Sequence, residues 1–318
     1  MIKPVIINMK AMAILPPFLP IDEIKAGVRQ ILPDMDIRTD TDFEKSEADV
    51  LVVTTFTRVD SEILDKFPSL KFIQVASTGY DNVDLSAVKE RRVALSNIPV
   101  ANKESVAEHV IAMALSLLKD MRFLDNELRN GNWPMITGSR ELKGKTFGIV
   151  GMGAIGVRLA ERLLPFEVGI VYNDVRRLPE EKEQNLGLTY LPLDKLLQVS
   201  DMISIHVPLT ADTDRMFSSA TFGKMKDGAI LINTSRGEVV DEKALIEAVK
   251  NKGLKAGLDV FMTEPPDFSS ELFKLDSVIF SPHIAGVTME SQQRFITETI
   301  SNVLRYAQGI DPLYRVEL

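Results

Sequence analysis

The sequence contains no cysteine and only three histidines, and these two shortages exclude several kinds of chemistry. Without thiols the chain cannot form disulfides, thiolate metal sites or a cysteine nucleophile. Histidine acid–base catalysis near neutral pH is restricted to His109, His206 and His283. We therefore predict no metal site, and we treat each of the three histidines as a candidate.

Positive charge and long apolar runs are also scarce. The chain has 37 Lys and Arg against 45 Asp and Glu, a formal net charge of −8. Nucleic-acid binding needs clustered positive charge, so we expect no nucleic-acid partner. A membrane-spanning helix would need about 18 uninterrupted apolar residues, and the apolar run near the start is too short for a signal peptide. We expect no membrane association and, by default, a cytoplasmic location.

The length and the overall composition favour a compact protein with two domains. Of the 318 residues, 45% are hydrophobic and 26% are charged, which is typical of a globular chain. A chain of this length exceeds one ordinary domain of roughly 100 to 200 residues. Two domains would also create a cleft between them.

Short apolar runs typical of buried strands alternate with helical patterns along the first hundred residues. The runs lie at 5–7, 50–53, 72–75 and 93–95. Alternating strands and helices imply a parallel sheet with right-handed crossovers. We therefore expect a small doubly wound α/β domain of the flavodoxin-like type, with its ligand loops at the carboxyl ends of the strands.

A second and stronger alternation follows an apolar helix expected at 102–118. Its expected strands lie at 147–150, 169–172, 202–205, 229–232 and 278–280. This pattern predicts a second doubly wound domain of the Rossmann type. A helical pattern that starts near Met289 is expected to return to the first domain, which gives a substrate domain of 1–98 plus 288–318 and a nucleotide-binding domain of 99–287.

A glycine-rich turn follows the first strand of the second alternation and opens a helix. It is made of Gly151, Gly153, Ala154, Ile155 and Gly156, with Met152 between the first two glycines. Such a turn permits a sharp bend, a close approach to a pyrophosphate and tight helix packing, and the helix N–H groups face the phosphates. Asp174 lies at the end of the next strand. Its spacing from the glycines along the sequence is that of the carboxylate that accepts hydrogen bonds from ribose hydroxyls in dinucleotide-binding domains.

Asp174 also favours NAD over NADP, although Arg176 and Arg177 lie close to it in the sequence. A carboxylate at the ribose would repel the 2′-phosphate of NADP, whereas a nearby arginine can accommodate that phosphate. We therefore expect NAD as the cofactor. The alternative for the glycines is that they only turn a strand into a helix.

Three side chains with catalytic potential follow separate strands of the second domain. Arg236 could hold a carboxylate bidentately, His283 could transfer a proton, and Glu264 could stabilise the imidazolium. Singly each residue is ambiguous, since Arg236 could be an ordinary surface arginine. His109 is more typical of a packed or capping residue, and His206 of a structural one.

Several motifs in order resemble the D-isomer-specific 2-hydroxyacid dehydrogenase family across essentially the whole chain. They are the glycine turn with Asp174, the run Asn233-Thr234-Ser235-Arg236-Gly237-Glu238-Val239-Val240-Asp241, the run Gly257-Leu258-Asp259-Val260-Phe261 followed by Glu264-Pro265, and Ser281-Pro282-His283. The segments Thr78-Gly79-Tyr80-Asp81-Asn82-Val83-Asp84 and 102–108 are similar to the family's substrate loop and hinge helix, respectively.

This resemblance implies hydride transfer between nicotinamide and C2 of a small 2-keto or D-2-hydroxy acid. Arg236, Glu264 and His283 would be the catalytic residues, and Ser77, Thr78 and Gly79 would bind the substrate carboxylate together with Arg236 and His283. The residues expected to bind the cofactor, besides the glycine turn and Asp174, are Val207, Pro208, Thr234, Ser235, Arg236, Asp259 and His283. A homodimer formed through 106–118 and the loop with Trp133 is also implied.

The resemblance leaves the substrate open, but it favours glyoxylate or hydroxypyruvate over phosphoglycerate. Relatives that act on phosphoglycerate often have an arginine where Thr54 stands, and Arg58 is expected at the start of a helix. Formate-oxidising relatives lack the glutamate found as Glu264, and phosphite-oxidising relatives have a lysine at the position of Thr78. The alternatives are a phosphoglycerate dehydrogenase and an NADH-sensing protein of the corepressor type.

Overall fold

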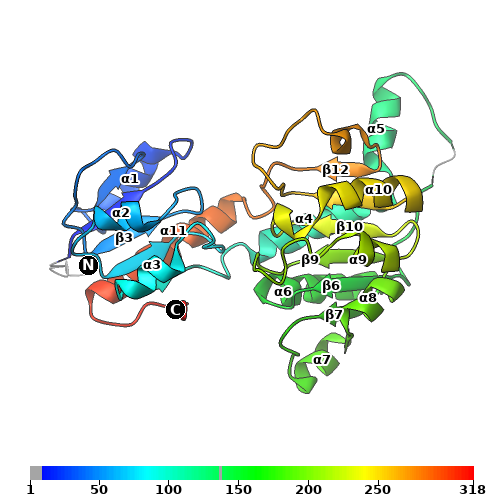
Figure 1. Ribbon diagram of the computed structural model, residues 1–318. Helices are drawn as coiled ribbons and strands as arrows, with labels where there is room; N and C mark the ends of the chain where they lie inside the picture. Colours follow the sequence, from blue (N-terminus) through cyan, green and yellow to red (C-terminus); the bar gives the residue numbers. More distant parts are fainter. Residues whose placement is uncertain (1–8, 136–137) are drawn as a thin grey trace. The chain divides into compact units, whose positions relative to one another are not determined.

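The computed structural model describes residues 9–135 and 138–318, and the chain forms two compact units (Figure 1). Unit 1 comprises Met1–Asn102 and Thr288–Leu318, and unit 2 comprises Lys103–Val287. The strand expected at 5–7 lies outside the described residues. Each unit is an α/β structure built on a parallel sheet, as the sequence predicts.

Unit 1 is built on a five-stranded parallel sheet of the order β2-β1-β3-β4-β5. This is the flavodoxin-like order, in which the chain reverses direction across the sheet between β1 and β3. The strands are β1 (Ala11–Ile14), β2 (Asp36–Arg38), β3 (Val50–Val53), β4 (Phe72–Val75) and β5 (Ala94–Ser96). The helices are α1 (Ile21–Arg29), α2 (Ser61–Asp65), α3 (Leu85–Glu90) and α11 (Met289–Ala307).

Alternate side chains of the central strands form two cores, one on each face of this sheet. Val50 and Val52 pack with residues of α1 and α11, whereas Leu51 and Val53 pack with residues of α2 and α3. The helix α11 is held on β4 by the stacked rings of Phe72 and Tyr306, whose centroids are 4.9 Å apart. The end of the chain is thus an integral part of unit 1.

Unit 2 is built on a seven-stranded parallel sheet of the order β12-β11-β10-β9-β6-β7-β8. Six of these strands follow the Rossmann order, and β12 extends it at one edge. The strands are β6 (Thr146–Val150), β7 (Gly169–Asn173), β8 (Leu188–Tyr190), β9 (Met202–Ile205), β10 (Ile230–Asn233), β11 (Lys255–Leu258) and β12 (Val278–Phe280). The change of direction falls between β6 and β9.

Helices cover both faces of the sheet of unit 2 (Figure 1). The α-helices are α4 (Lys103–Leu118), α5 (Met121–Arg129), α6 (Ala154–Leu163), α7 (Glu180–Leu186), α8 (Leu193–Val199), α9 (Ser219–Lys224) and α10 (Glu242–Lys252). Three 3-10 helices complete the set, η1 (Leu164–Phe166), η2 (Gly237–Val239) and η3 (Glu271–Lys274). Asp241 begins α10 by accepting the backbone N–H of Ala244, a common way to satisfy a helix start.

The period-two alternation of the strands again separates two cores. Leu231 of β10 packs with residues of α8, α9 and α10, whereas its neighbours Ile230 and Ile232 pack with residues of α4 and α6. The apolar stripe of α4 is therefore covered by unit 2 itself. The burial of this stripe within the unit means that it does not by itself call for the homodimer implied through 106–118.

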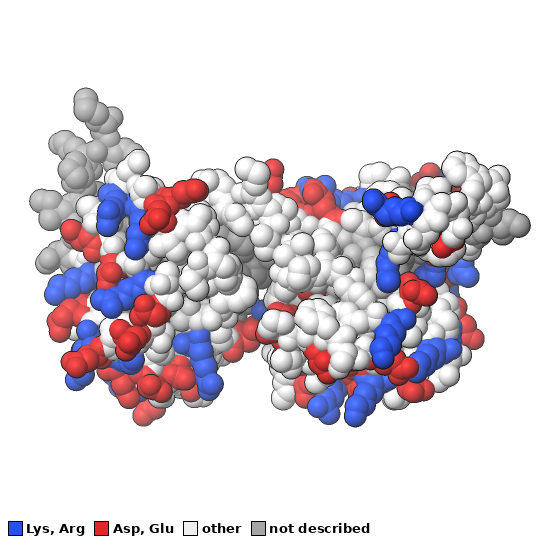
Figure 2. Space-filling model, turned by 90° about the horizontal axis from the view of Figure 1, so that it is seen from above, with Lys and Arg blue, Asp and Glu red and all other residues white. Residues whose placement is uncertain are grey.

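The outer surface carries charges of both signs. On the face drawn in Figure 2, the blue Lys and Arg side chains and the red Asp and Glu side chains are interspersed. Within residues 9–135 and 138–318, none of the helices is both long and apolar enough to cross a membrane.

Candidate active site

The glycine turn lies between β6 and α6, at the point where the sheet of unit 2 changes direction. Gly151 has φ +98°, and a Cβ atom there would lie 2.6 Å from the carbonyl carbon of His206. A Cβ atom at Gly156 would lie 2.2 Å from the carbonyl oxygen of Gly151. Both positions therefore require glycine, the first for the turn and its packing against the loop after β9, the second for the packing of α6 on the turn.

Gly153 is different, because a Cβ atom there would meet no described atom within 4 Å. It caps the start of α6, and as a glycine it has no side chain that could accept a hydrogen bond from the helix. The open space beside the first N–H groups of a ten-residue helix suits an anion such as a phosphate.

Asp174 follows β7 and is tied to the glycine turn. One of its carboxylate oxygens accepts the backbone N–H of Met152 at 2.6 Å, and the other accepts that of Arg176 at 2.8 Å. A carboxylate has about four acceptor sites, so these two bonds leave capacity for ribose hydroxyls. Asp174 thus both shapes the turn and presents negative charge beside it.

The guanidinium of Arg177 is engaged in unit 2 by Glu183. Its Nε and Nη2 atoms donate to the two oxygens of Glu183 at 2.9 and 2.8 Å. The arginine, with the hydroxyl of Tyr172, lowers the pKa of Glu183 to about 2. Because this bidentate pair holds its side chain, Arg177 is poorly suited to bind a 2′-phosphate.

These features together fit a dinucleotide at the switch point of unit 2. Thr234 follows β10, and its Oγ1 atom is buried without a hydrogen-bond partner among the described residues. Buried hydroxyls are normally satisfied, so this atom points to a group that binds there. The glycine turn, Asp174 and Thr234 are thus the residues of this structure that suit NAD.

His283 and Glu264 are in direct contact. The Nδ1 atom of His283 lies 2.7 Å from Oε2 of Glu264, and the side chains are 39% and 34% exposed. The other oxygen of Glu264 accepts the backbone N–H of Phe261 at 3.1 Å, which fixes the carboxylate. The carboxylate orients the ring through Nδ1, while Nε2 lies on the other side of the ring.

The backbone of His283 is held by Asp259, which is 1% exposed. His283 has φ +54°, a left-handed conformation that a non-glycine residue rarely adopts. Its N–H donates to the carbonyl of Asp259 at 2.7 Å, and the Asp259 carboxylate accepts the N–H groups of Ile284 and Ala285, each at 2.9 Å. Asp259 therefore acts within this turn as its anchor.

Arg236 lies in a loop that Asn233 shapes. The buried Asn233 side chain donates to the carbonyl of Arg236 at 2.8 Å and accepts from the N–H of Ser235 at 3.0 Å. A Cβ atom at Gly237 would lie 2.0 Å from the carbonyl carbon of Phe261. Glycine therefore allows the loop that carries Arg236 to lie directly against the loop that leads to Glu264.

The other two histidines have different surroundings. Burial lowers the pKa of His206 to about 4, so its ring is neutral at neutral pH, and its Nε2 atom lies 2.9 Å from the Ser204 hydroxyl. The Nε2 atom of His109 lies 2.9 Å from the Ser281 hydroxyl. Of the three histidines, His283 is thus the one that is paired with a carboxylate at hydrogen-bond distance.

The expected substrate loop follows β4 in unit 1. The Ser77 hydroxyl accepts the N–H of Thr55 at 3.0 Å, and the Thr78 hydroxyl donates to the side chain of Asn102 at 2.9 Å. Asn97 donates to the Thr78 carbonyl at 2.6 Å. The loop is thus fixed from several sides within unit 1.

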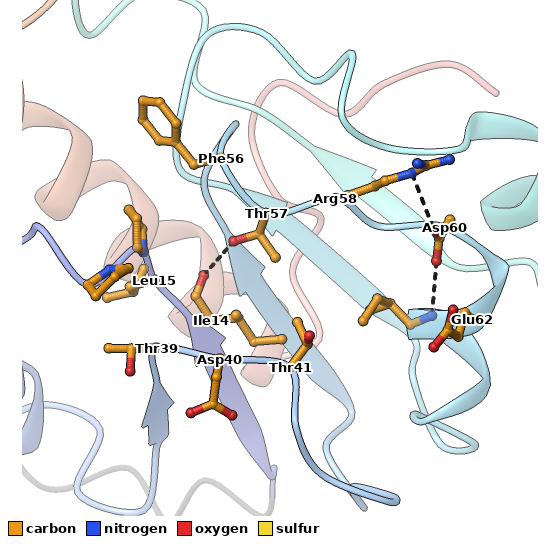
Figure 3. Close-up of a pocket in the computed structure, with 13 residues that line it drawn as sticks. Ile14, Leu15, Thr39, Asp40, Thr41, Phe56, Thr57, Arg58, Asp60 and Glu62 are labelled. Atoms are coloured by element: carbon orange, nitrogen blue, oxygen red, sulfur yellow. Dashed lines mark hydrogen bonds and ion pairs between the residues drawn. The ribbon is translucent and has the colours of Figure 1, made fainter. Parts of the chain in front are cut away.

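Unit 1 also contains a cavity of about 480 Å³ over the carboxyl ends of β1, β2 and β3 (Figure 3). Its residues include Leu15, Asp40, Phe56 and Arg58. This is the switch point of the unit 1 sheet, whereas the Ser77 loop follows β4 on the other side of β3. The side chain of Arg58 is 84% exposed, and its Nε atom lies 3.2 Å from the carboxylate of Asp60 (Figure 3).

The structure joins most of the predicted residues of unit 2 into one connected set. Glu264 and His283 touch directly, Asp259 holds the histidine turn, and Gly237 brings the arginine loop against that of Glu264. Sequence reasoning missed Asn233 as the residue that shapes the arginine loop. An asparagine at a strand end, two residues before a serine, is a turn signal that points to this role.

A parallel sheet in the Rossmann order, with a glycine turn at its switch point, defines unit 2 as a dinucleotide-binding domain of the dehydrogenase type. The model of the NAD-binding domain of the D-isomer specific 2-hydroxyacid dehydrogenases matches residues 111–285. The chain belongs to this family. It is therefore an NAD-dependent oxidoreductase, as the sequence predicts.

Individual relatives agree with this assignment. A glyoxylate reductase from Thermococcus litoralis is 39% identical over 275 residues, which cover 84% of this chain and 82% of the relative. A D-3-phosphoglycerate dehydrogenase from Archaeoglobus fulgidus is 36% identical, but the match covers 51% of that protein. The crystal structure of the D-lactate dehydrogenase from Aquifex aeolicus with NAD and lactic acid has a TM-score of 0.85 at 32% identity, covering 94% of this chain and 96% of that one.

Proposed function

We propose that this protein reduces a small 2-keto acid of the glyoxylate or hydroxypyruvate type to the D-2-hydroxy acid with NADH. The observation that carries the proposal is the 2.7 Å contact between His283 and Glu264, because it pairs a proton donor with a carboxylate in a dinucleotide-binding domain. The similarity to glyoxylate reductases supports the substrate class.

In this proposal the three catalytic residues divide the work. His283 transfers the proton of the substrate hydroxyl group through its Nε2 atom, because its Nδ1 atom is engaged by Glu264. It gives this proton during reduction and takes it in the reverse reaction. Arg236 holds the substrate carboxylate and polarises the keto oxygen. The backbone N–H groups of Ser77, Thr78 and Gly79 bind the second carboxylate oxygen. NAD supplies the hydride chemistry when it is bound.

The proposed cofactor site uses the loops at the carboxyl ends of the strands of unit 2. The glycine turn and the first residues of α6, Ala154 and Ile155, bind the pyrophosphate. Asp174 binds the adenosine ribose, and Val207 with Pro208 follows β9, where the Val207 backbone lies against Gly151 of the glycine turn. Thr234, Ser235, Arg236, Asp259 and His283 complete the nicotinamide end, although Asp259 already accepts several hydrogen bonds from its own turn.

We assign the proposed substrate loop, Ser77 to Gly79, to unit 1, and cofactor binding with the three catalytic residues to unit 2. The sequence predicts domain boundaries at 98/99 and 287/288. The two compact units of the structure divide after Asn102 and after Val287. A cytoplasmic location stays a prediction.

A panel of acids tests the substrate class. Glyoxylate, hydroxypyruvate, pyruvate and 3-phosphohydroxypyruvate would be compared as oxidants of NADH. We expect the unphosphorylated acids to be reduced best, since Thr54 offers no cation for a phosphate and Arg58 is paired with Asp60. A preference for the phosphorylated acid would support a phosphoglycerate dehydrogenase, and binding of NADH without turnover of any acid would support a sensing protein.

Replacing Asp174 by alanine should narrow the preference for NADH over NADPH. The substitution removes the charge that repels a 2′-phosphate, and it also removes the acceptor for the Met152 N–H. Asp174→Asn keeps an acceptor without the charge, so it separates the two effects. Steady-state kcat/KM with both cofactors measures the result, and comparable wild-type efficiency with NADH and NADPH would contradict the role of Asp174.

Replacing Glu264 by glutamine should lower kcat for keto-acid reduction while the Kd for NADH changes little. The carboxylate accepts a hydrogen bond from Nδ1 of His283, whereas the glutamine amide can also present its NH₂ group to that nitrogen, so the ring orientation is no longer fixed. The measurement is kcat under conditions where chemistry limits the rate, with an NADH titration as the control. A wild-type kcat with intact NADH binding would refute this role of Glu264.

We also propose a homodimer, with its interface at α5 and the following loop. No residue of α5 is buried, and Phe123 and Leu128 of this helix are 50% and 53% exposed. Trp133 is 78% exposed, and α5 stands off the sheet of unit 2 (Figure 1). Such an apolar surface favours association between copies. Light scattering at micromolar concentration should give twice the monomer mass, and a Trp133→Ser variant should weaken the association.

A further inference from the structure

The helix α4 contacts the turn that carries His283 at two points. The Ser105 hydroxyl donates to the carbonyl of Ala285 at 2.6 Å, and the Nε2 atom of His109 lies 2.9 Å from the Ser281 hydroxyl. Ser105 and His109 are four residues apart, so they lie on the same face of the helix. The two contacts therefore lie on either side of His283 in its turn, one at Ser281 and one at Ala285.

The available protons determine which way the second hydrogen bond runs. The Ser281 hydroxyl has one hydrogen, and it donates to Oδ1 of Asp259 at 2.5 Å. Asp259 is buried, and its other contacts in this turn come from backbone N–H donors, so its carboxylate acts as an acceptor. The Ser281 oxygen must then accept the proton of His109, which requires hydrogen on Nε2.

The result is a chain of contacts that ends at the backbone of His283. His109 orients the Ser281 hydroxyl, the hydroxyl orients the Asp259 carboxylate, and the Asp259 carbonyl accepts the N–H of His283 at 2.7 Å. His283 needs such support because its left-handed backbone is otherwise disfavoured. A small displacement of its ring would misplace the proton that it transfers.

We propose that His109 is a positioning residue for His283, acting through Ser281 and Asp259, with Ser105 as a second support. The proposal rests on the function proposed above for His283. His109 contributes only its Nε2–H donor, which both the neutral tautomer and the protonated ring can provide.

The test compares His109→Leu with His109→Gln. Leucine removes the donor, whereas the glutamine amide places an N–H donor near the position of Nε2. We expect His109→Leu to lower kcat for hydroxypyruvate reduction roughly ten- to hundredfold, with the Kd for NADH little changed. His109→Gln should retain most of the wild-type kcat. Met113→Leu is the matched control, since Met113 is buried on the same helix and lies against Gly257.

A second measurement does not depend on a variant. Imidazole ¹⁵N shifts of the wild-type protein should show hydrogen on Nε2 of His109. Hydrogen on Nδ1 alone would overturn the proposal. A kcat of His109→Leu within twofold of the wild-type value would also overturn it. So would a kcat of His109→Gln no higher than that of His109→Leu, measured for variants of equal thermal stability. Absence of NADH oxidation by the wild-type protein with every keto acid of the panel would instead refute the proposed function, so the two failures are distinguishable.

Discussion

Replacing His283 by alanine should lower kcat for keto-acid reduction by about two to four orders of magnitude, the usual contribution of a positioned general acid. The alanine has no proton to give, and Glu264 loses the group that it orients. His206 cannot take over, because burial lowers its pKa to about 4 and its ring stays neutral. The Kd for NADH should change little, because the phosphates and the ribose are proposed to bind at the glycine turn and Asp174.

Stopped-flow oxidation of NADH with a saturating keto acid measures this effect at the chemical step. Fluorescence titration with NADH provides the control for binding. A His283→Ala variant that retained wild-type single-turnover rates would refute the assignment of the proton donor. A variant that failed to bind NADH would show damage to the fold and would call for His283→Gln, which preserves more of the side chain's volume.

Replacing Arg236 by alanine should impair both substrate binding and turnover. The guanidinium is assigned to the carboxylate, which stays charged throughout, and to the keto oxygen, which gains charge as the hydride arrives. Loss of one donor to such an oxygen costs about two to three orders of magnitude in kcat. Loss of the grip on the carboxylate should raise KM as well.

Arg236→Lys should recover little of this loss. A lysine provides a point charge, whereas the planar guanidinium can donate two parallel hydrogen bonds to a carboxylate. Steady-state kinetics of the wild type and both variants with hydroxypyruvate provide the measurement. If the lysine variant regained wild-type kcat and KM, charge alone would suffice, and the bidentate role of Arg236 would be wrong.

The sequence was most informative where a motif requires a particular backbone. Gly151 and Gly156 were predicted as parts of a phosphate-binding turn, and the structure gives the reason, since a Cβ atom at either would overlap backbone atoms. The order of strands and helices likewise predicted two parallel sheets, which the structure confirms. Glu264 and His283 were expected to be near each other, and they are in contact.

The sequence was less informative where an element is short or its side chains are weak signals. β1 contains two alanines, β2 is the three-residue run Asp36–Arg38 at an edge, and β8 is also three residues long, so none of the three was predicted. Strands of this kind depend on their neighbours in the sheet rather than on their own pattern.

The supports of the candidate site were hidden for a different reason. Ser281 and His109 are 172 residues apart in the sequence, and only the fold brings them to hydrogen-bond distance. Asp259 was expected to bind the nicotinamide end of the cofactor, yet its carboxylate anchors the turn of His283. Sequence patterns reveal which side chains can carry chemistry, but the residues that hold them in place appear only in three dimensions.

The most direct test of the central claim is the configuration of the product. Hydroxypyruvate would be reduced with NADH, and the glycerate formed would be resolved by chiral chromatography for the wild type and for His283→Ala. The proposed function predicts D-glycerate in an amount equal to the NADH oxidised, with the yield nearly abolished in the variant. L-glycerate, a racemic product or equal yields from the two proteins would contradict it.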